Sequence, residues 1–267
     1  MSKEKKEELT NEEKEELVNL TGENNIKAPK RMNLPIIKLN GSKGLFFKNE
    51  NVDGKYTQTE LEASEIKGTV LKIRRVLTAH KKEQGKDTTL FSNEHNSWRD
   101  EVVLFEASEG ETRLLIKADV PAVREKFPEL RVKQIFYFLP EGEKEVIKLA
   151  IRGKGLSAMY DFFNELDTDE HLFEYVISVG VQEEEGKLGN YFFNTFEKIK
   201  PVDDIKLIQE KIKEVVKSIE QAEEFYKKKD EEMKEKYSNS AVPKIGKSDE
   251  DIPVVDDDEI DVDEIPF

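Results

Sequence analysis

The side chains of this sequence that could do chemistry are bases and aromatic rings, placed close together in short, strand-like segments. The stretch from Lys27 to Lys48 has six Lys and Arg residues and no acid, and the stretch from Lys67 to Lys86 has seven, with Glu83 as its one acid. Positive side chains neutralise phosphates, and aromatic rings between them give unpaired bases a surface for stacking. This combination predicts binding of a single-stranded nucleic acid.

Strand geometry suggests which of these side chains are available. Successive residues on a strand face opposite ways, so Lys72 and Arg74 are expected to point outward together, with Ile73 inward. By the same rule, at most one of Phe46 and Phe47 is expected in the core. The predicted nucleic-acid-binding residues are Lys38, Lys43, Phe46, Phe47, Lys72, Arg74, Arg75, His80, Lys81, Lys82, Phe91, Trp98, Arg99, Arg152 and Lys154.

Two readings of Trp98, the only tryptophan, are open. It closes the polar segment that starts at Ser92, and Arg99 follows it. An exposed indole there would be a stacking platform, with the guanidinium of Arg99 next to it for a phosphate. Alternatively, Trp98 begins the following strand and is buried.

The sequence gives weak support to catalysis. Cysteine is absent, which excludes thiolate zinc sites, disulfides and cysteine nucleophiles, and the three histidines have unrelated spacings. Asp167, Asp169 and Glu170 could bind a metal, but acid-rich turns next to helices are much commoner, and a metal-dependent nuclease is a distant third reading. We therefore expect no enzyme, no cofactor and no metal.

The C-terminal segment is strongly acidic and ends on a short apolar group. Residues 249–267 hold ten carboxylates and no Lys or Arg, and the chain finishes Ile265-Pro266-Phe267. Such a segment buries too little apolar surface to offset its ordering entropy, so it is expected to be disordered in isolation. Pro266 restricts Ile265 to extended geometry and brings a stiff apolar end next to the terminal carboxylate, which suits a basic, apolar pocket on a partner.

This terminus resembles the acidic tip of bacterial single-stranded DNA-binding proteins, which also ends in acids followed by Ile-Pro-Phe. The family usually has three consecutive acids there, whereas Val262 interrupts them here. The resemblance implies that the tip recruits replication, recombination or repair enzymes. The residues implied in partner binding are Asp261, Asp263, Glu264, Ile265, Pro266 and Phe267.

The resemblance also implies that the chain binds and protects single-stranded DNA, although stacking and phosphate contacts would serve RNA equally. A charged leader and a larger strand region differ from the bacterial form, and a divergent phage or mobile-element member would explain this. The alternative is a non-enzymatic adaptor, such as a recombination mediator or inhibitor, that uses protein contacts alone.

The distribution of charge reconciles an acidic protein with nucleic-acid binding. The net charge is −15, and the ten carboxylates of residues 249–267 account for ten of these charges. The first 28 residues lack the apolar core of a signal peptide, and no apolar run reaches the roughly 18 residues that cross a bilayer. The cytoplasm is the expected location.

The elements predicted to position these residues are mainly β-strands. We expect an α+β, OB-like Greek-key barrel with additional strands over 29–202, after a charged leader at 1–28. A helix over 203–237 has Ile205, Ile212 and Ile219 at heptad spacing, which would pair with a second copy or dock on its own domain. A linker and acidic tail fill 238–267. Shorter helices are expected at Val120–Phe127, capped by Asp119, and at Ser157–Leu166.

Overall fold

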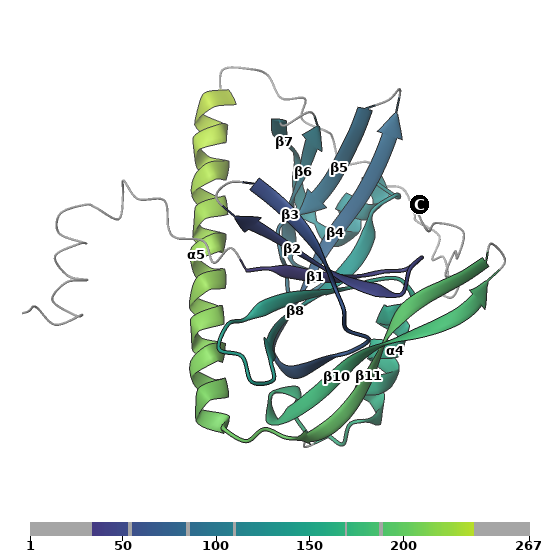
Figure 1. Ribbon diagram of the computed structural model, residues 1–267. Coiled ribbons are helices and arrows are strands. Elements are labelled where there is room, and N and C mark those ends of the chain that lie inside the picture. The colour runs from purple at the N-terminus through teal and green to yellow at the C-terminus, as the bar shows by residue number, and fades with distance from the viewer. Residues whose placement is uncertain are drawn as a thin grey trace, which may run out of the picture. The chain divides into compact units, whose positions relative to one another are not determined.

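The computed structural model describes residues 34–52, 55–83, 86–108, 111–168, 170–186 and 189–237 (Figure 1). The chain divides into two compact units. The larger unit contains the described residues up to Val215, and the described residues from Val216 to Tyr237 belong to the second. The predicted leader at 1–28 and the predicted linker and tail at 238–267 lie outside the described residues.

The larger unit is mainly β, which confirms the predicted fold class at that level. Its described strands form one mixed sheet: β1 Ile36–Asn40, β2 Leu45–Val52, β3 Lys55–Leu61, β4 Ile66–Glu83, β5 Lys86–Ser92, β6 Glu101–Ser108, β7 Glu111–Asp119, β8 Arg131–Pro140, β9 Ile147–Ile151, β10 Tyr175–Gly186 and β11 Gly189–Pro201. The order is β3-β2-β1-β9-β8-β4-β5-β6-β7, and β10 joins β4 to β11. Strands β1 and β9 are parallel, while the other pairs are antiparallel.

Strand β4 connects the parts of the sheet, because different stretches of it pair with different neighbours. Its 18 residues pair with β8 from Gly68 to Thr78, with β10 near Ile66, and with β5 from Thr78 to Glu83. The register against β8 shifts between Val70 and Lys72. An irregularity of this kind bends a strand, and 18 residues is long for one strand.

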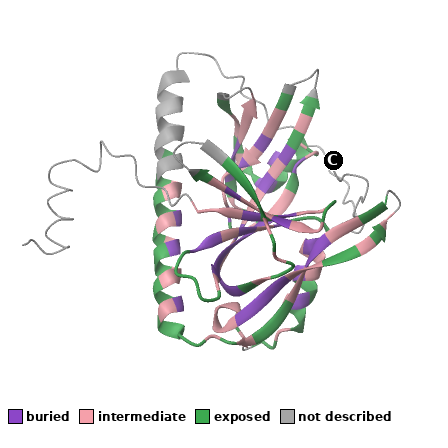
Figure 2. Ribbon diagram, viewed as in Figure 1, coloured by how far each residue is buried: buried purple, intermediate pink, exposed green. Residues whose placement is uncertain are grey.

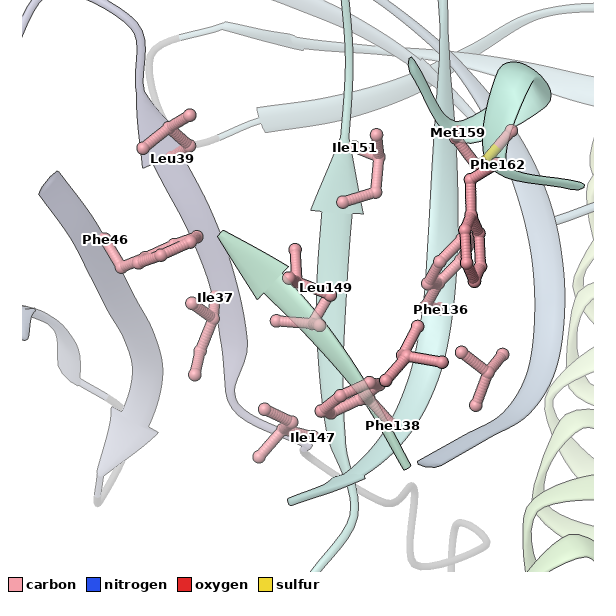
Figure 3. Packing of buried hydrophobic residues seen from close by; sticks show 13 residues of the cluster. Ile37, Leu39, Phe46, Phe136, Phe138, Ile147, Leu149, Ile151, Met159 and Phe162 are labelled. Atoms are coloured by element: carbon pink, nitrogen blue, oxygen red, sulfur yellow. The ribbon is translucent and has the colours of Figure 1, made fainter. Parts of the chain in front are cut away.

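Two apolar cores hold the sheet in shape (Figure 2). The first lies between β1, β2, β8, β9, β10 and helix α4 (Lys154–Glu165), and Figure 3 shows Phe46, Ile37 and Leu149 directed toward one another from three strands. The second lies between the end of β4, strands β5 and β6, and helix α3 (Val120–Lys126), with Leu77 and Leu104 fully buried. The segment from β5 to α3 thus has its own core.

Local sequence explains where the helices begin. Asp119 accepts a hydrogen bond from Ala122 N at 2.9 Å and caps α3, which has Pro121 in its first turn, as predicted. Helix α4 begins at Lys154, three residues before the predicted start. A 3-10 helix (Leu172–Glu174) occupies the predicted start of β10.

Helix α5 (Ile205–Tyr237) matches the predicted helix closely. Ile208 and Val215 are buried, whereas Ile205 is exposed. Burial of Ile208 and Val215 means that part of the apolar stripe packs within the larger unit. Among the described residues, no helix is both long enough and apolar enough to span a membrane.

Candidate nucleic-acid interface

The central strands have one side in the first core and a second side turned away from it. Residues paired across neighbouring strands share a side of the sheet. On the second side, Ile135 of β8 pairs with Arg74 of β4 and with Ala150 of β9. Ala150 in turn pairs with Lys38 of β1, which pairs with Phe47 of β2. We call this side, from β2 across β1, β9, β8 and β4 to β5, the basic face.

Four basic residues interact on this face, three from the strands β1, β4 and β8 and one directly after β9, and we call Lys38, His80, Lys133 and Arg152 the basic cluster. Lys133 pairs with Val76 of β4, and extending the β8–β9 register by one residue puts Lys133 opposite Arg152. Lys38 lies beside Ala150, on the same side of the sheet as Arg152. His80 lies further along β4, where its Nδ1 is 3.0 Å from Thr89 Oγ1.

The cluster is electrostatically costly. Burial is the main cause that lowers the pKa of Lys133 to about 8, and the nearby charges of Arg152 and Lys38 contribute to the same shift. Burial and Arg152 also lower the pKa of Lys38, and burial followed by the three cations lowers the pKa of His80. Lys38, His80 and Arg152 nevertheless keep solvent-accessible surface.

Several lysines elsewhere in the described residues have carboxylate partners. Lys67 pairs with Glu65 at 2.7 Å, and Lys200 pairs with Glu141 at 2.9 Å. Among the residues that the structure describes, no carboxylate forms a salt bridge with Lys38, Lys133 or Arg152. The fold therefore brings these cations together without neutralising them, which is characteristic of a site for an anion.

Half-buried aromatic rings flank the basic cluster on the same face. Phe47 lies beside Lys38 on one flank. On the other, Phe91 of β5 pairs with Thr78 of β4, and its ring stacks on Phe105 of β6 with 5.4 Å between centroids and 23° between planes. Basic residues thus lie between aromatic side chains at both ends of the face, and each ring retains accessible surface for a stacked base.

The loop between β5 and β6 covers part of the basic face and uses two of its cations. Arg74, only 4% exposed, donates to Glu94 O at 2.7 Å and to Asn96 Oδ1 at 2.8 Å. The Glu94 carboxylate accepts hydrogen bonds from Tyr137 at 2.6 Å and from Lys148. Lys72 and Arg74 face away from the core and Ile73 packs against it, as predicted, but Arg74 serves mainly to hold this loop.

Trp98 lies at the end of the same loop and is 37% exposed, so the alternative in which it is buried is wrong. The guanidinium carbon of Arg75 is 5.4 Å from the centre of the indole ring, and that of Arg124 is 5.6 Å away. Arg75 also donates to Asn96 O at 2.9 Å. Trp98 with Arg75 and Arg124 forms a cation–aromatic group that is separate from the basic cluster, and Arg99 next to it is exposed.

The remaining predicted residues are scattered. Phe46 is 1% exposed and belongs to the core, so its prediction as a binding residue is corrected: adjacent strand residues face opposite ways, and Phe47 is the accessible one. Lys43 is exposed in the turn after β1, and Lys82 is exposed near the end of β4. Lys81 pairs with Glu129, and Lys154 pairs with Glu184 rather than joining Arg152.

Sequence reasoning missed Lys133 and Phe105. Each is a single residue of its type within a mostly apolar strand, so no local cluster marks it. The signal that could have indicated Lys133 is the alternation along β8, in which Lys133, Ile135 and Tyr137 face one side of the sheet. Val132, Gln134 and Phe136 face the other side. That pattern separates two faces but does not say which neighbouring strands add further cations.

The groups that could have supported catalysis have structural contacts. Glu170 accepts a hydrogen bond from Tyr175 at 2.9 Å and pairs with Lys198, while Asp169 lies outside the described residues. His95 is buried, and its backbone bridges to Arg75. In the described part of the chain, no group of three or more His, Cys, Asp or Glu residues is arranged to hold a metal ion.

Comparison with known proteins identifies no relative of this chain. No family model matches it, and neither does any curated protein or solved structure. The functional argument therefore depends on the geometry of the basic face and on the sequence of the C-terminus.

Proposed function

We propose that this protein binds single-stranded DNA across the basic face, protects it, and recruits partner enzymes through its C-terminal tip. The observation that carries the proposal is the basic cluster: Lys38 of β1, Lys133 of β8 and Arg152 directly after β9 converge without carboxylate partners among the described residues. Phe47 on one flank and Phe91 with Phe105 on the other supply rings for stacking. Phosphate contacts and base stacking together give affinity that tolerates any sequence.

The order of the strands supports an OB-like barrel. In an OB-fold the first strand lies between the second and fourth, the third follows the second, the fifth pairs with the fourth, and a helix commonly joins the third to the fourth. Here β4 lies between β8 and β10, β9 follows β8, β11 pairs with β10, and α4 joins β9 to β10. The hairpin of β1 and β2 has no counterpart among these five strands and is an addition to them. It contacts both β9 and β11: β1 pairs with β9, and Phe192 N of β11 donates to Gly41 O at 2.7 Å.

This correspondence supports the choice of face. OB-folds bind oligonucleotides on the face of their second and third strands and with the loop between the first and second. The equivalent strands are β8, which contains Lys133, and β9, which ends one residue before Arg152. The equivalent loop is the whole segment from β5 to α3, which brings Phe91 and Phe105 to the face.

The chemistry favours a single strand over a duplex. Phe47, Phe91 and Phe105 are half-buried rings on the basic face, and only unpaired bases can stack on such rings. The preference for DNA over RNA rests on the resemblance of the C-terminus to bacterial single-stranded DNA-binding proteins. The tip residues Asp261, Asp263, Glu264 and Ile265-Pro266-Phe267, proposed to bind partner enzymes, lie outside the described residues.

Titration with fluorescently labelled oligo(dT) at several salt concentrations tests the proposal. The logarithm of the affinity should fall with the logarithm of salt by about 0.7 per phosphate contact. Lys133→Met should weaken binding, whereas Lys144→Met should change it little, because Lys144 is exposed in the turn beyond the far end of β8. A duplex of the same length should bind more weakly.

Two results would contradict the proposal. Absence of binding to oligo(dT) at low salt would favour the non-enzymatic adaptor instead. Equal loss of affinity in Lys133→Met and Lys144→Met would mean that binding is diffuse and that the basic face has no special part in it.

A further inference from the structure

We propose that Lys38, Lys133 and Arg152, with His80 at the edge, form a site for a single phosphate group that anchors one position of the bound strand. This inference rests on the proposed function and adds a specific feature to it. Most phosphate contacts of a sequence-tolerant binder are interchangeable. The geometry here points to one contact that is different from the others.

The spacing of the three cations fits one anion. Lys133 and Arg152 lie opposite each other on neighbouring strands, so their Cα atoms are separated by about 5 Å. Lys38, on the adjacent strand, lies beside Ala150. Ala150 is two residues before Arg152, so Lys38 is displaced from Arg152 by roughly 7 Å along the strand direction, on the same side of the sheet. Side chains as long as Lys and Arg can converge on one tetrahedral anion from such positions.

The chemical roles of the three side chains are complementary. An arginine guanidinium can hold two phosphate oxygens in its planar fork, and lysine ammonium groups act as point charges. Lys133 is half-buried within the cluster, and Lys38 and Arg152 keep accessible surface. A phosphate entering from solvent would therefore meet Lys38 and Arg152 first and end over Lys133.

Burial and mutual repulsion of the cations make the empty site electrostatically unfavourable, and a bound anion would offset this cost. Burial and two neighbouring cations lower the pKa of Lys133 to about 8, and the three described cations have no salt-bridge partner in the described residues. A positively charged surface could avoid this cost by pairing each lysine with a carboxylate, as Lys148 is paired with Glu94. A dianion or a phosphodiester is the class of ligand that would offset three convergent positive charges.

Competition between oligo(dT) and inorganic phosphate tests this inference at constant ionic strength, with chloride as the reference anion. Phosphate at twice its own dissociation constant should weaken oligonucleotide binding about threefold in the wild-type protein. Lys133→Met should bind the oligonucleotide less tightly and lose this sensitivity to phosphate. Arg152→Gln, a second variant that changes no buried apolar residue, should also lose it. Lys144→Met should keep it.

Two sources of phosphate are separated by the oligonucleotide itself. Equal affinity for 5′-phosphorylated and 5′-hydroxyl oligo(dT) would identify an internal phosphodiester as the occupant, and tighter binding of the phosphorylated form would identify a terminal phosphate. Either result supports the site. Phosphate sensitivity that is unchanged in both Lys133→Met and Arg152→Gln would overturn it.

A separate measurement distinguishes failure of this site from failure of the proposed function. Without any oligonucleotide, replacing chloride by phosphate should raise the unfolding temperature more in the wild-type protein than in Lys133→Met, because phosphate also stabilises folded proteins without a specific site. If oligo(dT) does not bind but this difference between the two proteins is present, the phosphate site stands without the DNA-binding role. If oligo(dT) binds and the difference is absent, the DNA-binding role stands without the phosphate site.

Discussion

Lys133 should make the free protein less stable while it helps to bind an anion. Its pKa falls from 10.5 unfolded to about 8 folded, so the folded state binds fewer protons than the unfolded state between these values. The resulting cost is present in full below pH 8 and disappears as pH rises toward 10.5. We expect Lys133→Met to raise the free energy of unfolding by about 1–3 kcal/mol at pH 7 and by less at pH 10.

Urea denaturation of both proteins at the two pH values measures this effect. Lys144→Met provides the control, because an exposed lysine in a turn should change stability by less than about 0.5 kcal/mol at either pH. A stability loss in Lys133→Met at pH 7 would show that the ammonium group is well solvated or paired. A gain in stability together with a loss of oligonucleotide affinity would be typical of a binding residue.

The same pKa gives the binding reaction a pH dependence. Free Lys133 loses its proton as pH rises through about 8, so affinity for oligo(dT) should decline between pH 7 and 9. Lys38 and Arg152 face Lys133, and His80, whose pKa is lowered below its usual value, is already neutral in this range. Lys133→Arg keeps its charge throughout, so its affinity should stay constant over the same interval. A parallel decline in both proteins would assign the effect to another group.

Glu94 is expected to limit binding to the basic face. Its carboxylate accepts hydrogen bonds from Lys148 and Tyr137, so it occupies a position where a phosphate could otherwise bind. Removing this charge in Glu94→Gln should increase oligonucleotide affinity about fivefold at low salt, since one charge acting at about 4 Å in water corresponds to roughly 1 kcal/mol. The control Glu143→Gln removes a carboxylate from the turn after β8 and should have little effect. Weaker binding of Glu94→Gln would mean that Glu94 positions the loop rather than competing with the strand.

At the scale of single elements, strand β2 separates folding from binding in two adjacent residues. Phe46 points into the first core (Figure 3), whereas Phe47 pairs with Lys38 on the basic face. Phe46→Ala should destabilise the protein by about 3–5 kcal/mol, the usual cost of deleting a buried ring. Phe47→Ala should leave the denaturation midpoint much closer to wild type and reduce binding by about 1–3 kcal/mol if a base stacks there. Similar effects of both changes on stability, without an effect on binding, would contradict the assignment.

Most elements could be predicted from alternation and turn residues, and the exceptions have physical causes. Strand β8 is predictable because Phe136 and Phe138 alternate with residues of the other face. The start of α3 is predictable because Asp119 is a typical helix cap. Strand β3 escapes prediction because Thr57, Gln58, Thr59 and Glu60 are all exposed, so no apolar period reveals it. Only Leu61, at the end of β3, packs against the first core, and one apolar residue gives no period that would predict a strand.

The candidate site was harder to predict than the elements. Lys38, His80 and Arg152 could be selected from local basic sequence, but their meeting point depends on β1 pairing in parallel with β9 and on β4 pairing with β8. Local clustering instead drew attention to Lys81 and Lys154, which carboxylates neutralise in the fold. Which basic residues remain unpaired is a property of tertiary structure.

For the whole molecule, the separation of charge matters more than its sum. Ten of the fifteen net negative charges come from residues 249–267, and the basic cluster lies in the larger unit. The paired strands β10 and β11 have Glu183, Glu184 and Glu185 near their turn, away from β8 and β9 (Figure 1). Negative charge at that hairpin would disfavour a phosphate backbone there, so a bound strand should run toward β5 and β6 instead.

An acidic segment attached to a protein with a cationic face should compete with DNA for that face. We expect deletion of residues 249–267 to tighten oligo(dT) binding about tenfold at 10 mM salt, where charges interact over roughly 30 Å. The gain should vanish near 1 M salt, where this distance is about 3 Å. Replacing the ten carboxylates by Asn and Gln keeps the length of the segment and should reproduce the deletion, which separates charge from bulk. Unchanged or weaker binding at low salt in both variants would exclude self-competition, and the segment would then act on partners alone.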